Sequence, residues 1–228
     1  MFEVPRLTIR PGTGGYNKGQ ARVIEILEAA LDVLLDEGYQ ALTMRRIARA
    51  CGITVGNVTY YYKTKDDLVR DLTAGVLESY LHIFSDISTD ESRSVEDRFV
   101  TVIRLLLEDI MTKKTTHFFP ELWALANHDP FIAERVNELY IGARSVLNNL
   151  IPRLNPSLSA EECELVALFV SASIEGMTVF AGYKKPWQPH MQEIEGIAVK
   201  SLLDCVKTIT SRDIALFKNE DFSLNQKA

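Results

Sequence analysis

Three helix-start signals follow one another in the first third of this sequence. The hydroxyls of Thr43, Thr54 and Thr64 are each placed to accept a hydrogen bond from a backbone N–H of a first helical turn, and so to N-cap a helix. The first two helices have to be short, covering about 43–51 and 55–62. Two short helices joined by a turn of three or four residues have the dimensions of a helix-turn-helix motif.

The turn between the two short helices supports the same interpretation. It covers residues 52–54 and begins with a glycine, which is common in such turns. Leu42 and Ile47 flank the first cap, and Ile53 and Val58 flank the second, at the spacing of a hydrophobic staple. Both helix starts therefore have a polar and an apolar determinant.

The segments on either side of the motif also have helical periodicity. Apolar residues recur at three- and four-residue intervals over 18–37, and Gly38 follows where glycine commonly ends a helix. Asp66 and Asp67 suit the positive N-terminal end of a long helix that continues toward residue 84. No later segment has a strand signature, so the sequence predicts an all-α protein.

The remainder is expected to divide into a linker and several helices. Residues 85–94 are rich in serine and aspartate and predict a polar linker, and helical periodicity resumes over 95–111. The later prolines should separate the helices that follow, because proline disfavours a helical residue before it. These prolines are Pro120, Pro130, Pro152, Pro156, Pro186 and Pro189.

Two long helices are expected near the end of the chain, over residues 160–183 and 190–217. The first is apolar almost all round, and the second is amphipathic. Helices this apolar suit burial against a partner chain, which predicts a homodimer through the last two long helices. Burial in the core of a single chain is the alternative.

Charge is distributed unevenly along the chain. The net charge is −6, which by itself opposes binding to nucleic acid. Residues 40–65, however, contain five basic side chains and no acidic one, so this stretch is +5 and leaves −11 for the rest. The sequence therefore predicts one basic face on an acidic body, and a chance run of solvated charge is the alternative.

Several other classes of protein find no support in the sequence. The three cysteines are too far apart for a disulfide framework or a C-x-x-C site, and the histidines form no metal-ligand pattern, so no metal or other cofactor is expected. No catalytic motif such as H-E-x-x-H or G-x-S-x-G is present, which argues against an enzyme. Residues 1–17 are interpreted as a flexible leader without a secretory pattern. With no apolar run near the length of a membrane span, the sequence predicts a cytoplasmic protein that does not bind membranes.

The segment from Leu42 to Leu68, LTMRRIARACGITVGNVTYYYKTKDDL, closely resembles the DNA-binding domain of TetR-family transcriptional regulators. The resemblance rests on the threonine-capped helix, the glycine-apolar-threonine turn, Gly56, the run of tyrosines and the Lys-Thr-Lys start of the next helix. It implies an N-terminal three-helix helix-turn-helix domain over 18–70, followed over 71–228 by a C-terminal helical domain for ligand binding and dimerisation.

The resemblance also implies which residues meet DNA. On the second helix of the motif, Val58 and Tyr62 share one face and should pack inward, leaving the other face for the major groove. Thr59 and Tyr60 are the candidates for contacts with base edges. The other candidates on this helix are Val55, Gly56 and Asn57. The candidates for phosphate contacts are Thr43, Thr54, Tyr61 and Lys65, and Arg45 in the first turn of its helix could reach a phosphate or a neighbouring groove.

These features also have explanations that involve no DNA. The threonines could be caps alone, and the three tyrosines could be a packing cluster. In the leader, Arg6 and Arg10 with Lys18 could form a minor-groove arm or a solvated tail. Many members of the family carry lysine or another polar residue where this chain has Val55, and tyrosine where it has Thr59. An operator sequence is therefore not transferred from them.

The C-terminal domain more weakly resembles the BetI-type subgroup, in FPELWALA from Phe119, DP at 129 and EGM from Glu175. Phe119, Trp123 and Phe180 are the best candidates to line an apolar ligand pocket, and plain core positions are the alternative. Glu175 lies in an apolar helix, where a carboxylate needs a partner. It could hold a cationic ligand beside aromatic faces, or make a hydrogen bond across the helix bundle or a dimer seam.

The sequence as a whole predicts a sequence-specific DNA-binding transcriptional regulator, acting as a repressor that a small-molecule ligand releases from a palindromic operator. Its expected partners are double-stranded DNA, the small-molecule effector and a second copy of the chain. The alternative is a structural protein that binds DNA without sequence preference and has no effector.

Overall fold

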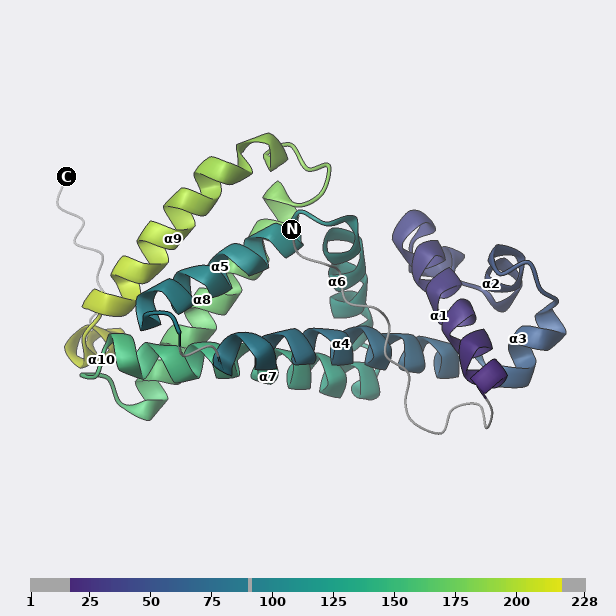
Figure 1. The fold of residues 1–228 in the computed structure, drawn as a ribbon, viewed down its shortest axis with the longest axis horizontal. Helices are drawn as coiled ribbons and strands as arrows, with labels where there is room; N and C mark the ends of the chain where they lie inside the picture. Colours follow the sequence, from purple (N-terminus) through teal and green to yellow (C-terminus); the bar gives the residue numbers. More distant parts are fainter. Residues whose placement is uncertain (1–16, 90–91, 219–228) are drawn as a thin grey trace. The chain divides into compact units, whose positions relative to one another are not determined.

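The described residues of the computed structural model are 17–89 and 92–218, and they form ten α-helices and two short 3-10 helices without a strand (Figure 1). The prediction of an all-α protein is confirmed. Two compact units make up the chain. The first consists of residues up to 84 together with 111–142, and the second of 85–110 together with 143 onward. The predicted leader lies outside the described residues, except for residue 17.

The first unit contains the predicted motif. Its helices are α1 (Asn17–Glu37), η1 (Tyr39–Ala41), α2 (Met44–Ala50), α3 (Val55–Tyr61), most of α4 (Lys65–Thr89), α6 (Lys113–Ala126) and the first half of α7 (Pro130–Leu154). Helix α2 packs against α1, and α3 packs against α2. The side chains of Leu42, Ile47 and Val58 are fully buried, which is the result expected for the staple positions.

The three predicted caps are present. The hydroxyl of Thr43 accepts a hydrogen bond from the backbone N–H of Arg46 at 3.1 Å, and that of Thr54 accepts one from Asn57 at 3.3 Å. Thr64 and Asp67 cap reciprocally, because each backbone N–H donates to the other's side chain at 3.1 Å. Helices α2, α3 and α4 therefore begin where the sequence predicts.

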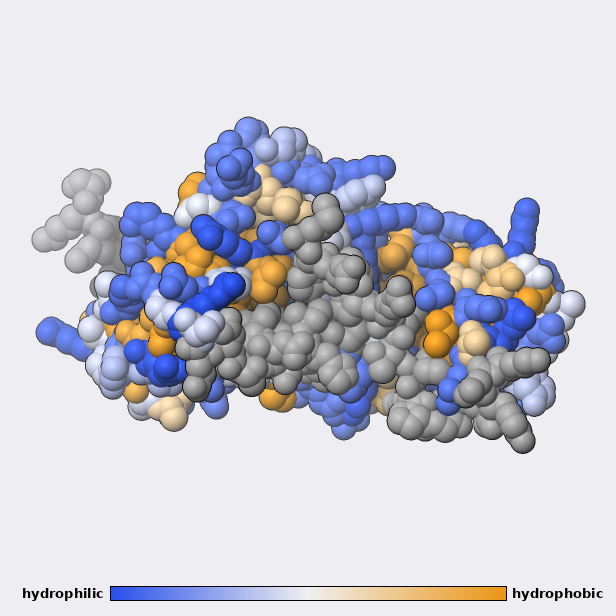
Figure 2. All heavy atoms as spheres, viewed as in Figure 1, coloured by the Kyte–Doolittle hydropathy of each residue, from blue (hydrophilic) through white to orange (hydrophobic). Residues whose placement is uncertain are grey.

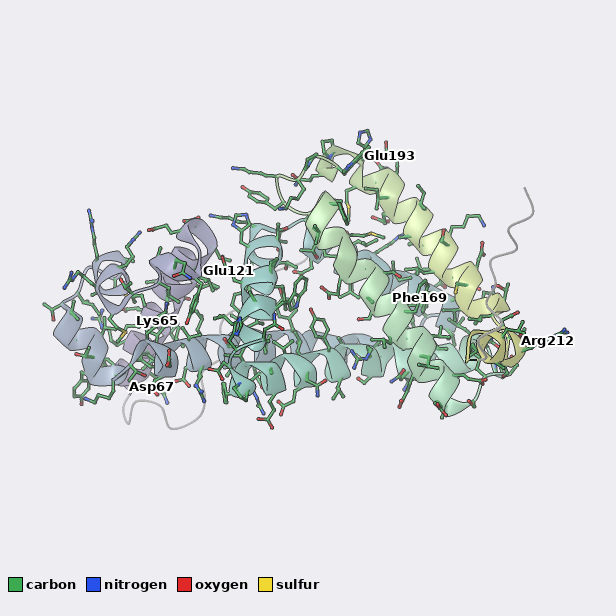
Figure 3. The ribbon with its side chains drawn as sticks, turned by 180° about the vertical axis from the view of Figure 1, so that it is seen from behind. Lys65, Asp67, Glu121, Phe169, Glu193 and Arg212 are labelled. Carbon is green, nitrogen blue, oxygen red and sulfur yellow. The ribbon has the colours of Figure 1, made fainter. Side chains whose placement is uncertain are left out.

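Helix α6 packs against α1, so it lies in the same unit as the motif. The Nδ1 atom of His117 on α6 lies 2.6 Å from the backbone oxygen of Leu35 near the end of α1. After α1 the chain turns at Gly38, whose φ of 79° favours glycine. A Cβ at Gly38 would also lie 3.2 Å from a carboxylate oxygen of Glu121, which Figure 3 labels on α6.

Some predicted boundaries are wrong. Residues 85–89 continue α4 and do not belong to a linker. Pro120 lies inside α6 and Pro152 inside α7. A proline removes only one backbone hydrogen bond, and in α6 the buried neighbours Phe118, Phe119 and Leu122 stabilise the helix across it. Pro152 stands in the last turn of α7, so it removes only its own bond to the carbonyl four residues earlier, and the helix ends two residues later.

The second unit contains the rest of the helices. They are α5 (Val95–Ile110), the second half of α7, α8 (Ala160–Ala181), η2 (Gln188–His190), α9 (Met191–Thr208) and α10 (Ser211–Lys218). Helix α5 packs against α8 and α9, which also contact each other. The predicted helix over 190–217 is two helices, since Ile209 is extended and Thr210 caps α10 through a hydrogen bond from Asp213 at 3.2 Å.

Helix α8 is long and apolar enough to cross a membrane by length and composition, and 33% of its most apolar stretch is buried. The expectation that no apolar run approaches the length of a span is therefore wrong. A core helix of a soluble protein has the same character. Several large apolar side chains of α8 are nevertheless exposed in the single chain.

Asn155 forms a buried polar link between the ends of α7 and α9. Its side-chain nitrogen donates to the backbone oxygens of Val206 at 2.9 Å and Ile209 at 2.8 Å. We expect Asn155→Ala to lower the free energy of unfolding by about 1–3 kcal/mol, because these carbonyls lose a donor in a buried place. Urea unfolding followed by circular dichroism measures the change. Ser157→Ala, which removes only an exposed hydroxyl bound to Asn155, is the control. An equal loss in both variants would contradict the assignment.

Candidate nucleic-acid interface

One face of α3 is fixed in the core of the first unit. Val58 is fully buried, and Tyr62, which directly follows the helix, is 3% exposed. The hydroxyl of Tyr62 donates to the carboxylate of Asp71 on α4 at 3.3 Å. Burial and the charge of Asp71 raise the pKa of Tyr62, so the hydroxyl stays a donor. The predicted inward face of α3 is confirmed.

The other face of α3 is open to solvent. Tyr60 is 74% exposed and Val55 is 40% exposed, and Gly56 and Asn57 are also exposed. The ring of Tyr60 stands edge-on to that of Tyr61, with centroids 5.0 Å apart. A large aromatic side chain left this exposed on a short helix is available to a partner.

Thr59 lies on α3 with its hydroxyl already in use. The hydroxyl lies 3.1 Å from the backbone oxygens of both Val55 and Gly56, to which it can donate its single proton. In this arrangement the side chain offers a methyl group and an acceptor oxygen to its surroundings. These groups suit a thymine methyl or the amino groups of adenine and cytosine.

The basic residues of the motif are divided between solvent and internal contacts. Arg45 and Arg49 on α2 and Lys63 after α3 are exposed. Arg46 instead pairs with Glu37 at the end of α1, with its Nε 2.9 Å from the carboxylate. The hydrogen bond from Arg46 lowers the pKa of Glu37. The basic face is therefore smaller than the charge count of residues 40–65 indicates.

Lys65, a predicted phosphate contact, stands in the first turn of α4, where Figure 3 labels it, and it contacts the turn between α1 and α2. Its Nζ lies 3.7 Å from the centroid of the Tyr39 ring and donates to the backbone oxygen of Tyr39 at 3.2 Å. Burial lowers the pKa of this ammonium group, and the nearby charge of Asp66 opposes the shift. Tyr39 could not be identified from the sequence, because it lies 26 positions from Lys65.

The four predicted ligand-binding residues do not all belong to one unit. Phe119 and Trp123 on α6 lie in the first unit, with ring centroids 6.3 Å apart, and the indole of Trp123 donates to the hydroxyl of Tyr140 at 2.9 Å. Glu175 and Phe180 lie on α8 in the second unit. Phe180 is 65% exposed, so the alternative that it is a core residue is wrong.

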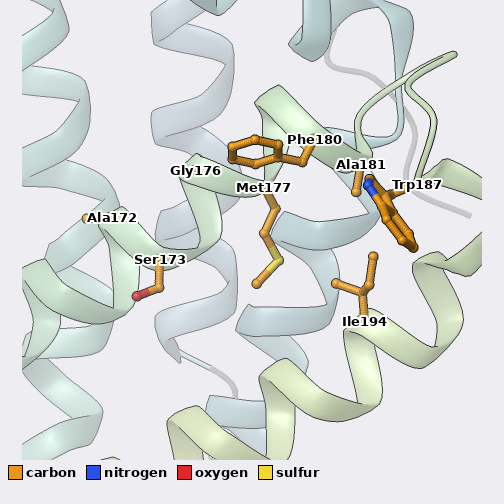
Figure 4. A pocket seen from close by; sticks show the side chains of 8 residues that line it. All are labelled: Ala172, Ser173, Gly176, Met177, Phe180, Ala181, Trp187 and Ile194. Atoms are coloured by element: carbon orange, nitrogen blue, oxygen red, sulfur yellow. The ribbon is translucent and has the colours of Figure 1, made fainter.

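Phe180 borders a groove of about 370 Å³ in the second unit. Figure 4 shows Met177 and Phe180 from α8, Trp187 from the connection before η2, and Ile194 from α9 around it. Trp187 is also 58% exposed. On the face drawn in Figure 2, hydrophilic residues cover most of the described surface, and hydrophobic atoms show between them in smaller areas.

Helices α1 to α3, with a buried inner face and an exposed outer face on α3, define a helix-turn-helix DNA-binding protein. Family comparisons agree with this class. Residues 26–72 match the family described as bacterial regulatory proteins, tetR family, and residues 95–204 match the BetI-type transcriptional repressor, C-terminal. The chain belongs to the TetR family of transcriptional regulators. Members of this family bind DNA and small-molecule effectors and act as dimers.

Individual relatives support the same assignment. An uncharacterised helix-turn-helix regulator from the dhlA 5' region of Xanthobacter autotrophicus is 26% identical over 72% of this chain and 81% of its own length. A transcriptional regulator of Mesorhizobium loti shares the fold with a TM-score of 0.66, at 16% identity over 83% of this chain and 98% of that one. A regulator of Saccharomonospora viridis, solved in complex with choline, has a TM-score of 0.59 at 15% identity, over 88% and 97%. All three of these proteins are described as transcriptional regulators.

Proposed function

We propose that this protein is a cytoplasmic, sequence-specific repressor whose homodimer binds a palindromic operator and leaves it when a small molecule binds the C-terminal domain. The observation that carries the proposal is the division of α3 into two faces. Val58 is buried in the core, while Tyr60 and Asn57 remain exposed. Both α3 and the helix that follows it, α4, have a capped N-terminus. A short rigid helix with an exposed polar and aromatic face suits the major groove.

The phosphate contacts are proposed for residues around this helix. Thr43 and Thr54 stand at helix starts, where backbone N–H groups and the helix dipole favour an anion. Arg45 is exposed, and Tyr61 adjoins Tyr60. Lysine and arginine neutralise phosphates and set the register of the protein on DNA, whereas Thr59, Tyr60, Val55 and Asn57 would read the bases.

The exposed side of α8 supports a homodimer through α8 and α9. Five large apolar residues at helical spacing are between 44% and 65% exposed on α8; they are Leu165, Leu168, Phe169, Val179 and Phe180. Ile197 on α9 is 66% exposed. Figure 3 labels Phe169 on this helix. An apolar stripe of this kind on a regulator that acts as a dimer is well suited to a second copy of the chain.

A small organic cation is the effector class to test first. Within the second unit, Glu175 places a half-buried carboxylate on α8, and Phe180 and Trp187 place exposed aromatic rings at the groove. Carboxylates and aromatic faces are the groups that bind quaternary ammonium ions. The Saccharomonospora relative was solved with choline. Choline added to an operator complex should therefore release DNA if the cation class is correct.

Selection of bound fragments from a random double-stranded DNA library tests the proposal as a whole. Enrichment of an inverted repeat by the purified protein would support a sequence-specific dimer. Binding that survives sequence scrambling at moderate salt, without enrichment, would favour the alternative of a structural DNA-binding protein without an effector.

Thr54 allows capping to be separated from phosphate binding. We expect Thr54→Asp to keep the stability of the wild type within about 0.5 kcal/mol, because aspartate caps helices as well as threonine does. The same variant should bind operator DNA at least about tenfold more weakly, since a carboxylate would face phosphate. Fluorescence anisotropy measures the affinity.

Two further variants at Thr54 serve as controls. Thr54→Ser should resemble the wild type in both properties, and Thr54→Ala should lose about 1 kcal/mol of stability with the cap. Wild-type affinity in Thr54→Asp would show that Thr54 acts as a cap alone.

A further inference from the structure

The link between Lys65 and Tyr39 goes beyond a chance surface contact. The Lys65 ammonium meets Tyr39 in two ways, over the ring at 3.7 Å and through a hydrogen bond to the backbone oxygen at 3.2 Å. The ring is attractive to a cation because its face carries negative charge, and the carbonyl fixes the ammonium at one edge of that face. Both contacts come from one residue, so the position of Tyr39 determines the position of the charge.

The helix that carries Lys65 is itself fixed. Thr64 and Asp67 cap α4 reciprocally at 3.1 Å. Further along α4, Arg70 pairs with Asp129 at the start of α7 with an Nη2 to carboxylate distance of 3.2 Å, and its guanidinium lies 4.7 Å from the centroid of Phe131. The first two turns of α4 are therefore held at both ends, so the backbone that carries Lys65 is fixed.

Because the Lys65 side chain is held in one position, it should bind a phosphate at a lower cost in conformational entropy. A free lysine loses much rotamer entropy when it pairs with a phosphate, because its stem has four rotatable bonds. Lys65 is already ordered, and the ammonium has three donors of which the Tyr39 carbonyl takes one. The ammonium also faces the Tyr39 ring at 3.7 Å, so at least one donor remains for an anion that approaches the start of α4.

The charges around Tyr39 are compatible with this arrangement. Burial raises the pKa of Tyr39, with smaller contributions from Asp66 and Asp129. The phenol therefore stays neutral, and the ring remains a neutral π surface for the cation. Lys65 itself is partly buried, so a contact that compensates for its desolvation matters more than on an open surface.

We propose that Tyr39 is a positioning residue for DNA binding, which holds the Lys65 ammonium ready for an operator phosphate through its ring and its carbonyl. This inference rests on the proposed function, and adds a residue to it that does not itself touch DNA. The competing explanation is structural: the pair would only join α4 to the turn after α1, and Lys65 would contact no phosphate.

The test compares four full-length variants on the selected operator across a salt series, with folding checked by circular dichroism. Lys65→Met should reduce the slope of log affinity against log salt by about 2 per dimer, one phosphate for each chain. Tyr39→Leu should lower affinity about fivefold to thirtyfold for two such sites, and Tyr39→Phe, which keeps the ring and the carbonyl, should bind as the wild type does. If Tyr39→Leu does not fold, Tyr39→Met is the non-aromatic variant.

The fourth variant, Tyr39→Leu with Lys65→Met, decides whether the two residues act together. If Tyr39 acts only through Lys65, this double variant should bind no more weakly than Lys65→Met alone. Full additivity of the two losses, or wild-type affinity and salt slope in Tyr39→Leu, would overturn the role of Tyr39 while leaving the operator-binding function intact. Failure of the wild type to bind any DNA would overturn both.

Discussion

Replacement of Phe169 by glutamate is expected to make the protein monomeric and to weaken operator binding by at least about a hundredfold. Phe169 is 55% exposed in the apolar stripe of α8, where the proposed dimer buries it. Glutamate would place an unpaired charge in an apolar seam, and twofold symmetry would bring a second one from the partner. Burial of an uncompensated charge costs several kcal/mol, and about 2.8 kcal/mol corresponds to a hundredfold loss. A monomer would also contact only one half of a palindrome.

Sedimentation velocity and fluorescence anisotropy on the selected operator measure the two effects. The matched control is Ile141→Glu on α7, because Ile141 is 54% exposed but lies outside α8 and α9. It should remain dimeric and bind DNA normally. A dimeric Phe169→Glu variant, or dissociation of both variants, would contradict a dimer through α8 and α9.

The local part of the fold could be predicted from the sequence, because its determinants are neighbours along the chain. A cap needs a hydroxyl and a backbone N–H three residues later, and the bonds at Thr43 and Thr54 have this form. The left-handed turn at Gly38 likewise depends on one residue type at one position. The division of α3 into faces follows from helical periodicity once the helix start is known.

The errors arose where packing decides between local preferences. Pro120 predicted a boundary, yet buried aromatic neighbours keep α6 continuous. The polar residues 85–89 predicted a linker, yet they continue α4. The break at Thr210 carried a weak signal, a threonine three residues before an aspartate, inside a segment whose apolar periodicity hardly changes. Tertiary context outweighs propensity in such places.

The candidate site shows the same division. Its α3 residues could be predicted because they lie in one short segment. Contacts between distant segments could not, and these include the pairing of Arg46 with Glu37 and of Lys65 with Tyr39. The count of charges over residues 40–65 included Arg46 and Lys65 in the basic face. Their partners are distant in the sequence, so the count could not show that both side chains make internal contacts.

Tyr60→Ala is the second variant with a large expected effect. Tyr60 is 74% exposed on α3, so its removal should leave stability within about 0.5 kcal/mol of the wild type. Contacts with base edges contribute about 1–3 kcal/mol each, and a symmetric dimer would lose two of them. Operator affinity should therefore fall between about thirtyfold and ten-thousandfold, while affinity for scrambled DNA, which depends on phosphates, should change little.

The run of three tyrosines supplies the control, because Tyr62 is 3% exposed and bonds to Asp71. Tyr62→Phe should lose about 1 kcal/mol of stability with that hydrogen bond, and keep the ratio of operator to scrambled-DNA affinity. Competition binding with both DNAs gives the ratio, and urea unfolding gives the stability. If Tyr60→Ala lowered both affinities equally, Tyr60 would be a phosphate contact, and base reading would pass to Thr59 and Asn57. If it changed neither, α3 would not be the helix that reads the operator.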